Sequence, residues 1–145
     1  MDLESRLRLD RDVPAVEAEL ESCGGELVRR NEDPAGLFWA VLQPVNRDRA
    51  PFIARIQWTV YPDREPSVLF ALSIGGPTTD LAGWPAAQGY RPPNDICKPF
   101  TAEGQALHAE WRTGVHAWRA DGNPFLFVVQ TLWGDIDRVD GARAA

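Results

Sequence analysis

Cys97 and His108 are the side chains whose types and positions most readily support covalent chemistry. Cys97 lies in the polar stretch "PPNDICKPF", where the neighbouring Lys98 would favour a thiolate, the nucleophilic form of cysteine. His108 follows in "QALHAEW" and could reach back to orient or deprotonate an attacking group. Asn94, just before Cys97, carries an amide that could donate to an oxyanion. These surroundings favour a reactive role for Cys97 over that of a small buried hydrophobe.

The same residues also have plainer interpretations. Asn94 fits a turn, His108 lies among aromatic residues and could simply be packed, and Cys23, at a predicted helix end, is expected to be a small buried hydrophobe. A Cys–His hydrolase would use Cys97 and His108 but also needs an orienting Asn or Asp and an oxyanion hole. A metal site has no recognised spacing among its candidate ligands, which are Cys97, His108, Glu110 and His116.

The composition excludes several classes of protein. At 145 residues the chain is expected to form one domain, residues 1–145. Its net charge is −6 and its 15 basic residues are scattered, which argues against a nucleic-acid partner. Two cysteines without a CxxC pair argue against structural zinc. No apolar run reaches the roughly 20 residues that span a bilayer, and "MDLESRLRLDRD" is not a secretory signal. We therefore expect no membrane partner and a cytoplasmic location.

The N-terminal region predicts one helix and the middle of the chain predicts strands. Residues 12–22 form the helix, with Asp12 as N-cap, although Leu3 and Leu7 could add a turn upstream if Pro14 kinks the chain. Four strands follow in "ELVRR", "LFWAVLQ", "FIARIQWTVY" and "SVLFALSI". The last two alternate between apolar and polar residues, with Leu72 and Ile74 on the apolar face. Short connections make the sheet antiparallel and the fold class α+β.

The C-terminal half predicts a long loop and then helices. Residues 75–99 are mostly Gly, Pro, Asp, Asn and Thr, so this stretch is expected to be irregular and functional or mobile. A helical stripe follows at Leu107, Trp111, Val115 and Trp118, which Gly104 and Gly114 would divide. The last helix opens with Asn123 and Pro124, a cap and a first-turn proline, despite the β-branched "FLFVV".

One stretch carries a family signature. In "YPDREPSVLF" the residues Tyr61, Pro62, Pro66, Val68 and Phe70 stand at the spacing of the Tyr-Pro…Pro…Val…Phe signature of ubiquitin-conjugating enzymes. "LFWAVLQ" resembles the second strand of that family, and "NPFLFVVQTLWGDI" resembles its helix after the active site. The chain thus resembles a diverged bacterial member of the ubiquitin-conjugating superfamily in the order of its elements.

The resemblance implies a fold and an activity. The fold would have an N-terminal helix, a four-stranded antiparallel meander, a long active-site loop and C-terminal helices. Cys97 would carry a ubiquitin-like protein as a thioester and pass it to an amine on a target protein. An adenylating activating enzyme would supply the cargo and would meet helix 12–22. No metal or organic cofactor is implied.

The chain departs from the family at one point. Ala87, Gln88 and Gly89 stand where the family has a His-Pro-Asn tripeptide ahead of its cysteine. Asn94 and His108 are candidate substitutes, and some diverged bacterial relatives carry a His after the cysteine. The missing tripeptide also leaves open an alternative: a catalytically inactive module that binds a ubiquitin-like protein or scaffolds an assembly.

Overall fold

The computed structural model describes residues 1–145, and an antiparallel sheet lies at its centre. The strand order is β1-β2-β3-β4, formed by Glu26–Val28, Leu37–Leu42, Phe52–Gln57 and Ser67–Ala71. The register pairs Ala40 with Ala54 and Ala54 with Phe70, so that alternate side chains of neighbouring strands point to the same face. The predicted α+β class and four-stranded antiparallel sheet are confirmed.

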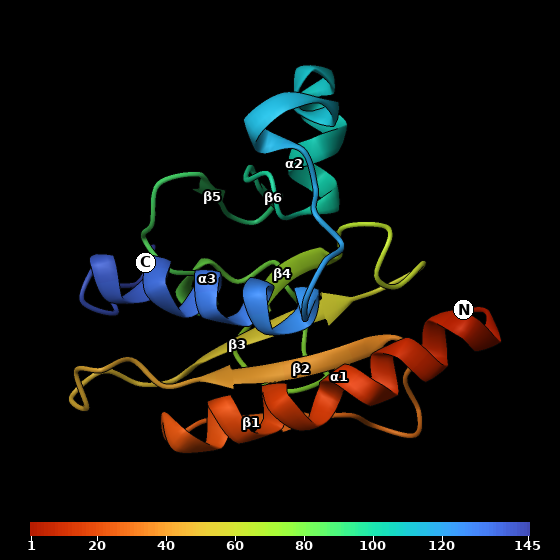
Figure 1. Ribbon diagram of the computed structural model, residues 1–145. Coiled ribbons are helices and arrows are strands. Elements are labelled where there is room, and N and C mark those ends of the chain that lie inside the picture. Colours follow the sequence, from red (N-terminus) through yellow and green to blue (C-terminus); the bar gives the residue numbers. More distant parts are fainter.

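Two helices bury the inner face of this sheet. α1 (Leu3–Ser22) lies along β1 and β2, and α3 (Pro124–Arg138) packs beside α1 (Figure 1). The shared core includes Leu9 and Val16 of α1, Phe38 of β2 and Leu132 of α3, all at most 1% exposed. The predicted cap of α3 is confirmed, because the side-chain oxygen of Asn123 accepts from the N–H of Leu126 at 2.9 Å. None of the helices combines the length and apolar character needed to cross a membrane.

The predicted start of the first helix is wrong. α1 begins at Leu3, with Asp2 as its N-cap, and it runs through Pro14 without a break. Its buried positions keep helical spacing on both sides of the proline: Ser5, Leu9, Asp12, Val16 and Leu20. Burial of this stripe outweighs the one backbone hydrogen bond that Pro14 removes. Asp12 is therefore an interior residue of the helix and not its cap.

The predicted extent of the last strand is also wrong. Leu72 and Ile74 are 52% and 36% exposed, because β4 ends at Ala71, which pairs with Ile53, two residues after Pro51. The helical stripe is divided, as its glycines led us to expect, into α2 (Ala102–Leu107) and two 3-10 helices, η2 (Ala109–Arg112) and η3 (Gly114–His116). Leu107 and Val115 are 55% and 83% exposed. Figure 1 shows this segment standing out from the body of the molecule.

The long loop is held in place by its aromatic residues. It contains a 3-10 turn, η1 (Leu81–Gly83), and a small hairpin, β5 (Tyr90–Arg91) with β6 (Asp95–Ile96). Trp84 is fully buried, and the hydroxyl of Tyr90 donates to the carboxylate of Asp135 on α3 at 2.8 Å. These anchors tie the hairpin to the core and so determine where the chain leaves β6.

The turn between β3 and β4 contacts both the N-terminal helix and the segment that follows Cys97. The Tyr61 hydroxyl donates to the buried carboxylate of Asp12 at 2.5 Å, and its backbone N–H donates to Ser5 Oγ at 3.1 Å. Burial first, and then the nearby Asp12 carboxylate, raise the pKa of Tyr61, so the hydroxyl stays a donor. On the other side of the turn, the carbonyl of Pro66 accepts from Ala102 N–H at 2.8 Å. This turn thus joins α1 to the start of α2.

Replacing Tyr61 by Phe should lower the free energy of unfolding by about 2 kcal/mol, because Asp12 then stays buried without its short hydrogen bond. Urea unfolding measures the loss. The same substitution in an Asp12→Ala background should have a clearly smaller effect. Equal losses in both backgrounds would show that the hydroxyl–carboxylate bond contributes nothing.

Candidate active site

Cys97 lies directly after β6, at the edge of the core. Its backbone N–H donates to the Gly89 carbonyl at 2.7 Å, while the preceding Ile96 is fully buried. The Thr101 hydroxyl donates to the Ile96 carbonyl at 2.5 Å and accepts from the N–H of Gly104 at 3.0 Å. The backbone on both sides of the cysteine is therefore fixed, and its free thiol is half-buried.

Gly104 lets α2, the helix that ends just before His108, approach the chain next to Cys97 closely. A Cβ at Gly104 would lie 2.1 Å from the carbonyl oxygen of Lys98, the residue next to Cys97. α2 can therefore dock against this turn only with glycine at that position. The side-chain amide of Gln105 adds to the docking by donating to the carbonyls of Pro99 and His116, at 2.9 and 3.1 Å.

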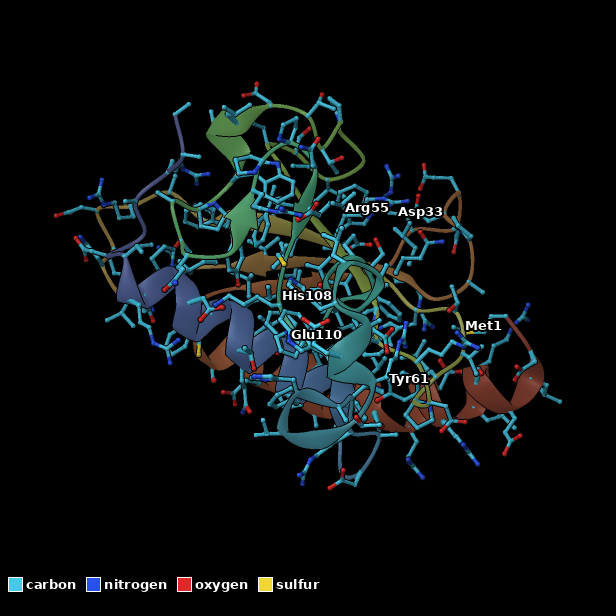
Figure 2. The ribbon with its side chains drawn as sticks, turned by 90° about the horizontal axis from the view of Figure 1, so that it is seen from above. Met1, Asp33, Arg55, Tyr61, His108 and Glu110 are labelled. Atoms are coloured by element: carbon cyan, nitrogen blue, oxygen red, sulfur yellow. The ribbon has the colours of Figure 1, made fainter.

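His108 is placed against Cys97 by this docking. It lies at the junction of α2 and η2, with its Nε2 3.1 Å from the Cys97 Sγ. Its Nδ1 lies 2.8 Å from Glu110 Oε1, and Figure 2 shows these two side chains next to each other. The imidazole can therefore accept the thiol proton at one nitrogen while its other nitrogen donates to a carboxylate.

Glu110 is the orienting group of this set. The hydrogen bond to His108 is the largest cause lowering the pKa of Glu110, so the carboxylate is ionised at neutral pH. The Glu110 side chain is 70% exposed, which limits the strength of the pair. Cys97, His108 and Glu110 form a nucleophile, a base and an orienting carboxylate in hydrogen-bond contact.

The neighbouring hairpin supplies a positive group. Arg91 on β5 makes two hydrogen bonds of 2.8 Å to the Asp95 carboxylate. These bonds are the main cause raising the pKa of Arg91, and the charge of Cys97 contributes in the same direction. The charge of Arg91 is therefore balanced mainly by Asp95 on the same hairpin.

Sequence reasoning placed Asn94 beside this chemistry, and the structure places it elsewhere. Asn94 is exposed in the turn between β5 and β6, where its N–H donates to the Arg91 carbonyl at 2.9 Å. The side chains of Cys97 and His108 bond to each other and to Glu110, not to Asn94. This is the position of a turn residue, and a catalytic part for Asn94 stays a prediction.

The two remaining candidates do not join the site. Cys23 lies half-buried at the C-terminal end of α1, and the contact of its sulfur is with Ser22 Oγ at 3.8 Å. His116 is exposed, and its ring lies 5.5 Å from that of Trp111. No group of three or more His, Cys, Asp or Glu side chains is arranged to hold a metal ion.

Glu110 was missed as an orienting group because its position relative to His108 depends on local conformation. Sequence reasoning considered Glu110 only as a metal ligand and Trp111 only as part of an apolar stripe. In the tight turn of η2, "HAEW" brings both of them onto the imidazole of His108. The signal in the sequence was the carboxylate two residues after the histidine, in a segment that Gly104 and Gly114 prevent from being one α-helix.

A cavity of about 550 Å³ opens beside the chain that follows Cys97. Pro99 and Phe100 form one end of it, and residues 115–119 and the outer side of α3 form its walls. Val115 and Phe127 line it while remaining 83% and 54% exposed. The cavity therefore offers apolar surface that begins two residues along the chain from Cys97, in a size range typical of ligand sites.

Comparison of the chain with protein-family models, with curated proteins and with solved structures finds no match. The resemblance carried by residues 61–70 therefore rests on the sequence alone. Any function has to be argued from the geometry of Cys97 and its neighbours.

Replacing Glu110 by Ala should slow alkylation of Cys97 by iodoacetamide about two- to fivefold near neutral pH, because the exposed carboxylate gives modest support to the imidazolium. Replacing it by Gln, which keeps an acceptor oxygen but no charge, should give an intermediate rate. The alkylation rate of Cys23 in the same protein serves as internal control. An unchanged Cys97 rate in both variants would remove Glu110 from the site.

Proposed function

We propose that the protein is a bacterial ubiquitin-conjugating-like enzyme. It accepts a ubiquitin-like protein from an adenylating activating enzyme onto Cys97 and passes it to an amine on a target protein. The observation that carries this proposal is the 3.1 Å contact between Cys97 Sγ and His108 Nε2, with Glu110 on the other ring nitrogen. Both cysteines are free thiols, which fits a reducing compartment such as the cytoplasm.

The arrangement of the fold supports the same proposal. A first helix, a four-stranded meander, a proline-bounded turn, a cysteine after the last strand and a closing helix follow one another as in the family that residues 61–70 resemble. The turn that carries the signature also positions the base, since Pro66 accepts from Ala102 and Glu103 accepts from the N–H of Val68 at 3.0 Å. A UBC-like fold for this chain is part of the proposal.

The proton transfers follow from the contacts. His108 Nε2 takes the proton of the Cys97 thiol, and the thiolate attacks the acyl carbon of the incoming cargo. The bond to the leaving group breaks, and a thioester to Sγ remains. The imidazolium gives its proton to the leaving group, so Nε2 is again free to take one from an attacking amine. The amide bond then forms, and Cys97 leaves as a thiolate.

A thiol hydrolase is the second candidate, because the Cys97–His108–Glu110 set would serve it as well. Fast hydrolysis also needs donors for an oxyanion. The backbone N–H groups of Cys97 and Lys98 are occupied by the carbonyls of Gly89 and Ile96. This favours slow reaction with water and a thioester that waits for an amine. A catalytically inactive scaffold is the third candidate, and it gives no role to a base beside the thiol.

One experiment separates the three candidates. The protein is mixed with a peptide thioester that ends in Gly-Gly, with and without an added amine, and intact-protein mass spectrometry follows the adduct. A transferase forms an adduct on Cys97 at least about tenfold faster than on Cys23, because only Cys97 has a base in contact. The adduct persists in water and disappears when the amine is added. Cys97→Ser abolishes the thioester, whereas Cys23→Ser does not.

The other outcomes contradict the transferase. Steady release of free peptide acid without added amine indicates the hydrolase. Equal acylation of Cys97 and Cys23 indicates the inactive scaffold. A His108→Ala variant that acylates and discharges at the normal rate would remove the base from the mechanism.

The cavity that begins at Pro99 should bind the extended end of the acyl donor. Val115→Asp and Phe127→Ser, both at exposed apolar positions of its lining, should slow acylation by the peptide thioester roughly fivefold. Iodoacetamide, which has no peptide tail, should react with Cys97 at the normal rate. Leu107→Ser is the matched control, since Leu107 is 55% exposed on the same projecting segment but lies outside the cavity. Equal slowing in all three variants would exclude the cavity as the donor site.

A further inference from the structure

The indole of Trp111 covers one face of the His108 imidazole. The two ring centroids are 4.0 Å apart and the ring planes differ by 18°, so the rings are stacked. Both residues belong to the turn at η2, where the N–H of Trp111 donates to the carbonyl of His108 at 3.0 Å. Side chains three residues apart eclipse each other in a 3-10 helix. The stacking is therefore built into the backbone of this turn.

The three contacts of His108 together fix the orientation of its ring. Cys97 contacts one ring nitrogen and Glu110 contacts the other, and these two contacts fix the rotation of the ring within its own plane. Trp111 packs on the face, which prevents the ring from tilting out of that plane. Because the His108 side chain is 36% exposed, little else restrains it from the solvent side.

The stack also discriminates between the two protonation states of the imidazole. A cation over an indole face is attracted by the negative face of the ring, and at exposed sites this shifts an equilibrium roughly two- to fivefold. A neutral imidazole gains less from the same contact. Proton transfer from the Cys97 sulfur to His108 Nε2 creates this cation, and so the stack favours the thiolate–imidazolium pair over the thiol–imidazole pair.

The charged and titratable groups around the pair come from η2, η3 and the β5–β6 hairpin. Glu110 favours the imidazolium directly, and Arg91 on β5 is paired with the Asp95 carboxylate. His116 of η3 lies against the indole of Trp111 with centroids 5.5 Å apart and rings tilted by 54°. The next ion pair on this segment is between Arg112 and Glu65, at 3.4 Å.

We propose that Trp111 is a positioning residue for the Cys97 chemistry, which holds the His108 ring in line with the thiol and stabilises its protonated form. The inference rests on the proposed function only in taking Cys97 as the nucleophile. Its test needs no acyl donor and no partner protein.

The test compares Trp111→Leu, which removes the ring, with Trp111→Phe, which keeps a smaller one. Iodoacetamide alkylation of Cys97 is followed from about pH 5 to pH 10, with Cys23 as internal reference. In Trp111→Leu the Cys97 rate should fall roughly two- to fivefold in the neutral range and should converge with the wild-type rate at the alkaline end. At that end the thiol ionises without help from the histidine. Trp111→Phe should recover most of the rate.

A second pair of variants shows whether Trp111 acts through His108. In a His108→Ala background, Trp111→Leu should have no further effect on the Cys97 profile. A loss of rate that is the same at every pH, or that persists in the His108→Ala background, would show that Trp111 only supports the fold of the segment and would overturn the proposal. An unchanged profile in Trp111→Leu would overturn it as well. If the alkylation result holds but peptide thioester transfer fails, the positioning role stands and the conjugating function falls.

Discussion

The buried hydrogen bond between Tyr61 and Asp12 is the constraint on which the rest of the structure depends. A carboxylate that is 7% exposed needs partners: Arg11 Nε donates to it at 3.2 Å from the same helix, and the hydroxyl from the β3–β4 turn reaches it from across the core. This fixes the turn against α1. The turn then offers the carbonyl of Pro62 to the indole N–H of Trp118, at 2.9 Å, and that of Pro66 to Ala102, at 2.8 Å. Hydrogen bonds to the same turn therefore hold both ends of the projecting segment, residues 102–118, in place.

A rigid frame of this kind explains how an exposed base can be held against a half-buried thiol. Two anchors fix residues 102–118, the close approach at Gly104 fixes the start of α2, and the 3-10 turn at η2 fixes the rings. Backbone geometry does the positioning, since the carboxylate of Glu110 is too exposed to hold the imidazole alone. The proposed chemistry therefore depends on packing at some distance from Cys97.

The sequence predicted those parts of the fold that local signals determine. The alternation along residues 52–57 and the Asn123–Pro124 cap were sufficient for β3 and α3. The sequence-based prediction failed where tertiary contacts override local preference. Burial of one stripe of α1 carries the helix through Pro14, and the Asp12 carboxylate accepts a hydrogen bond from Tyr61 instead of capping a helix. The meeting of Cys97 with His108 was anticipated as a possibility. The contacts that Glu110 and Trp111 make with His108 were not anticipated, because they depend on a 3-10 turn that residue types alone do not specify.

The balance between base and oxyanion donors is what separates the proposed transfer from hydrolysis. A Cys–His–carboxylate set activates a thiol equally well in either kind of enzyme. With the N–H groups of Cys97 and Lys98 already bonded to carbonyls, attack on a Cys97 thioester gains little from the nearest backbone. A strong nucleophile such as an amine tolerates that deficit far better than water does, particularly when His108 can take its proton. On this reasoning the occupied N–H groups of Cys97 and Lys98 matter as much as the base: because they do not serve an oxyanion, an acyl group would stay on Cys97 long enough to be passed on.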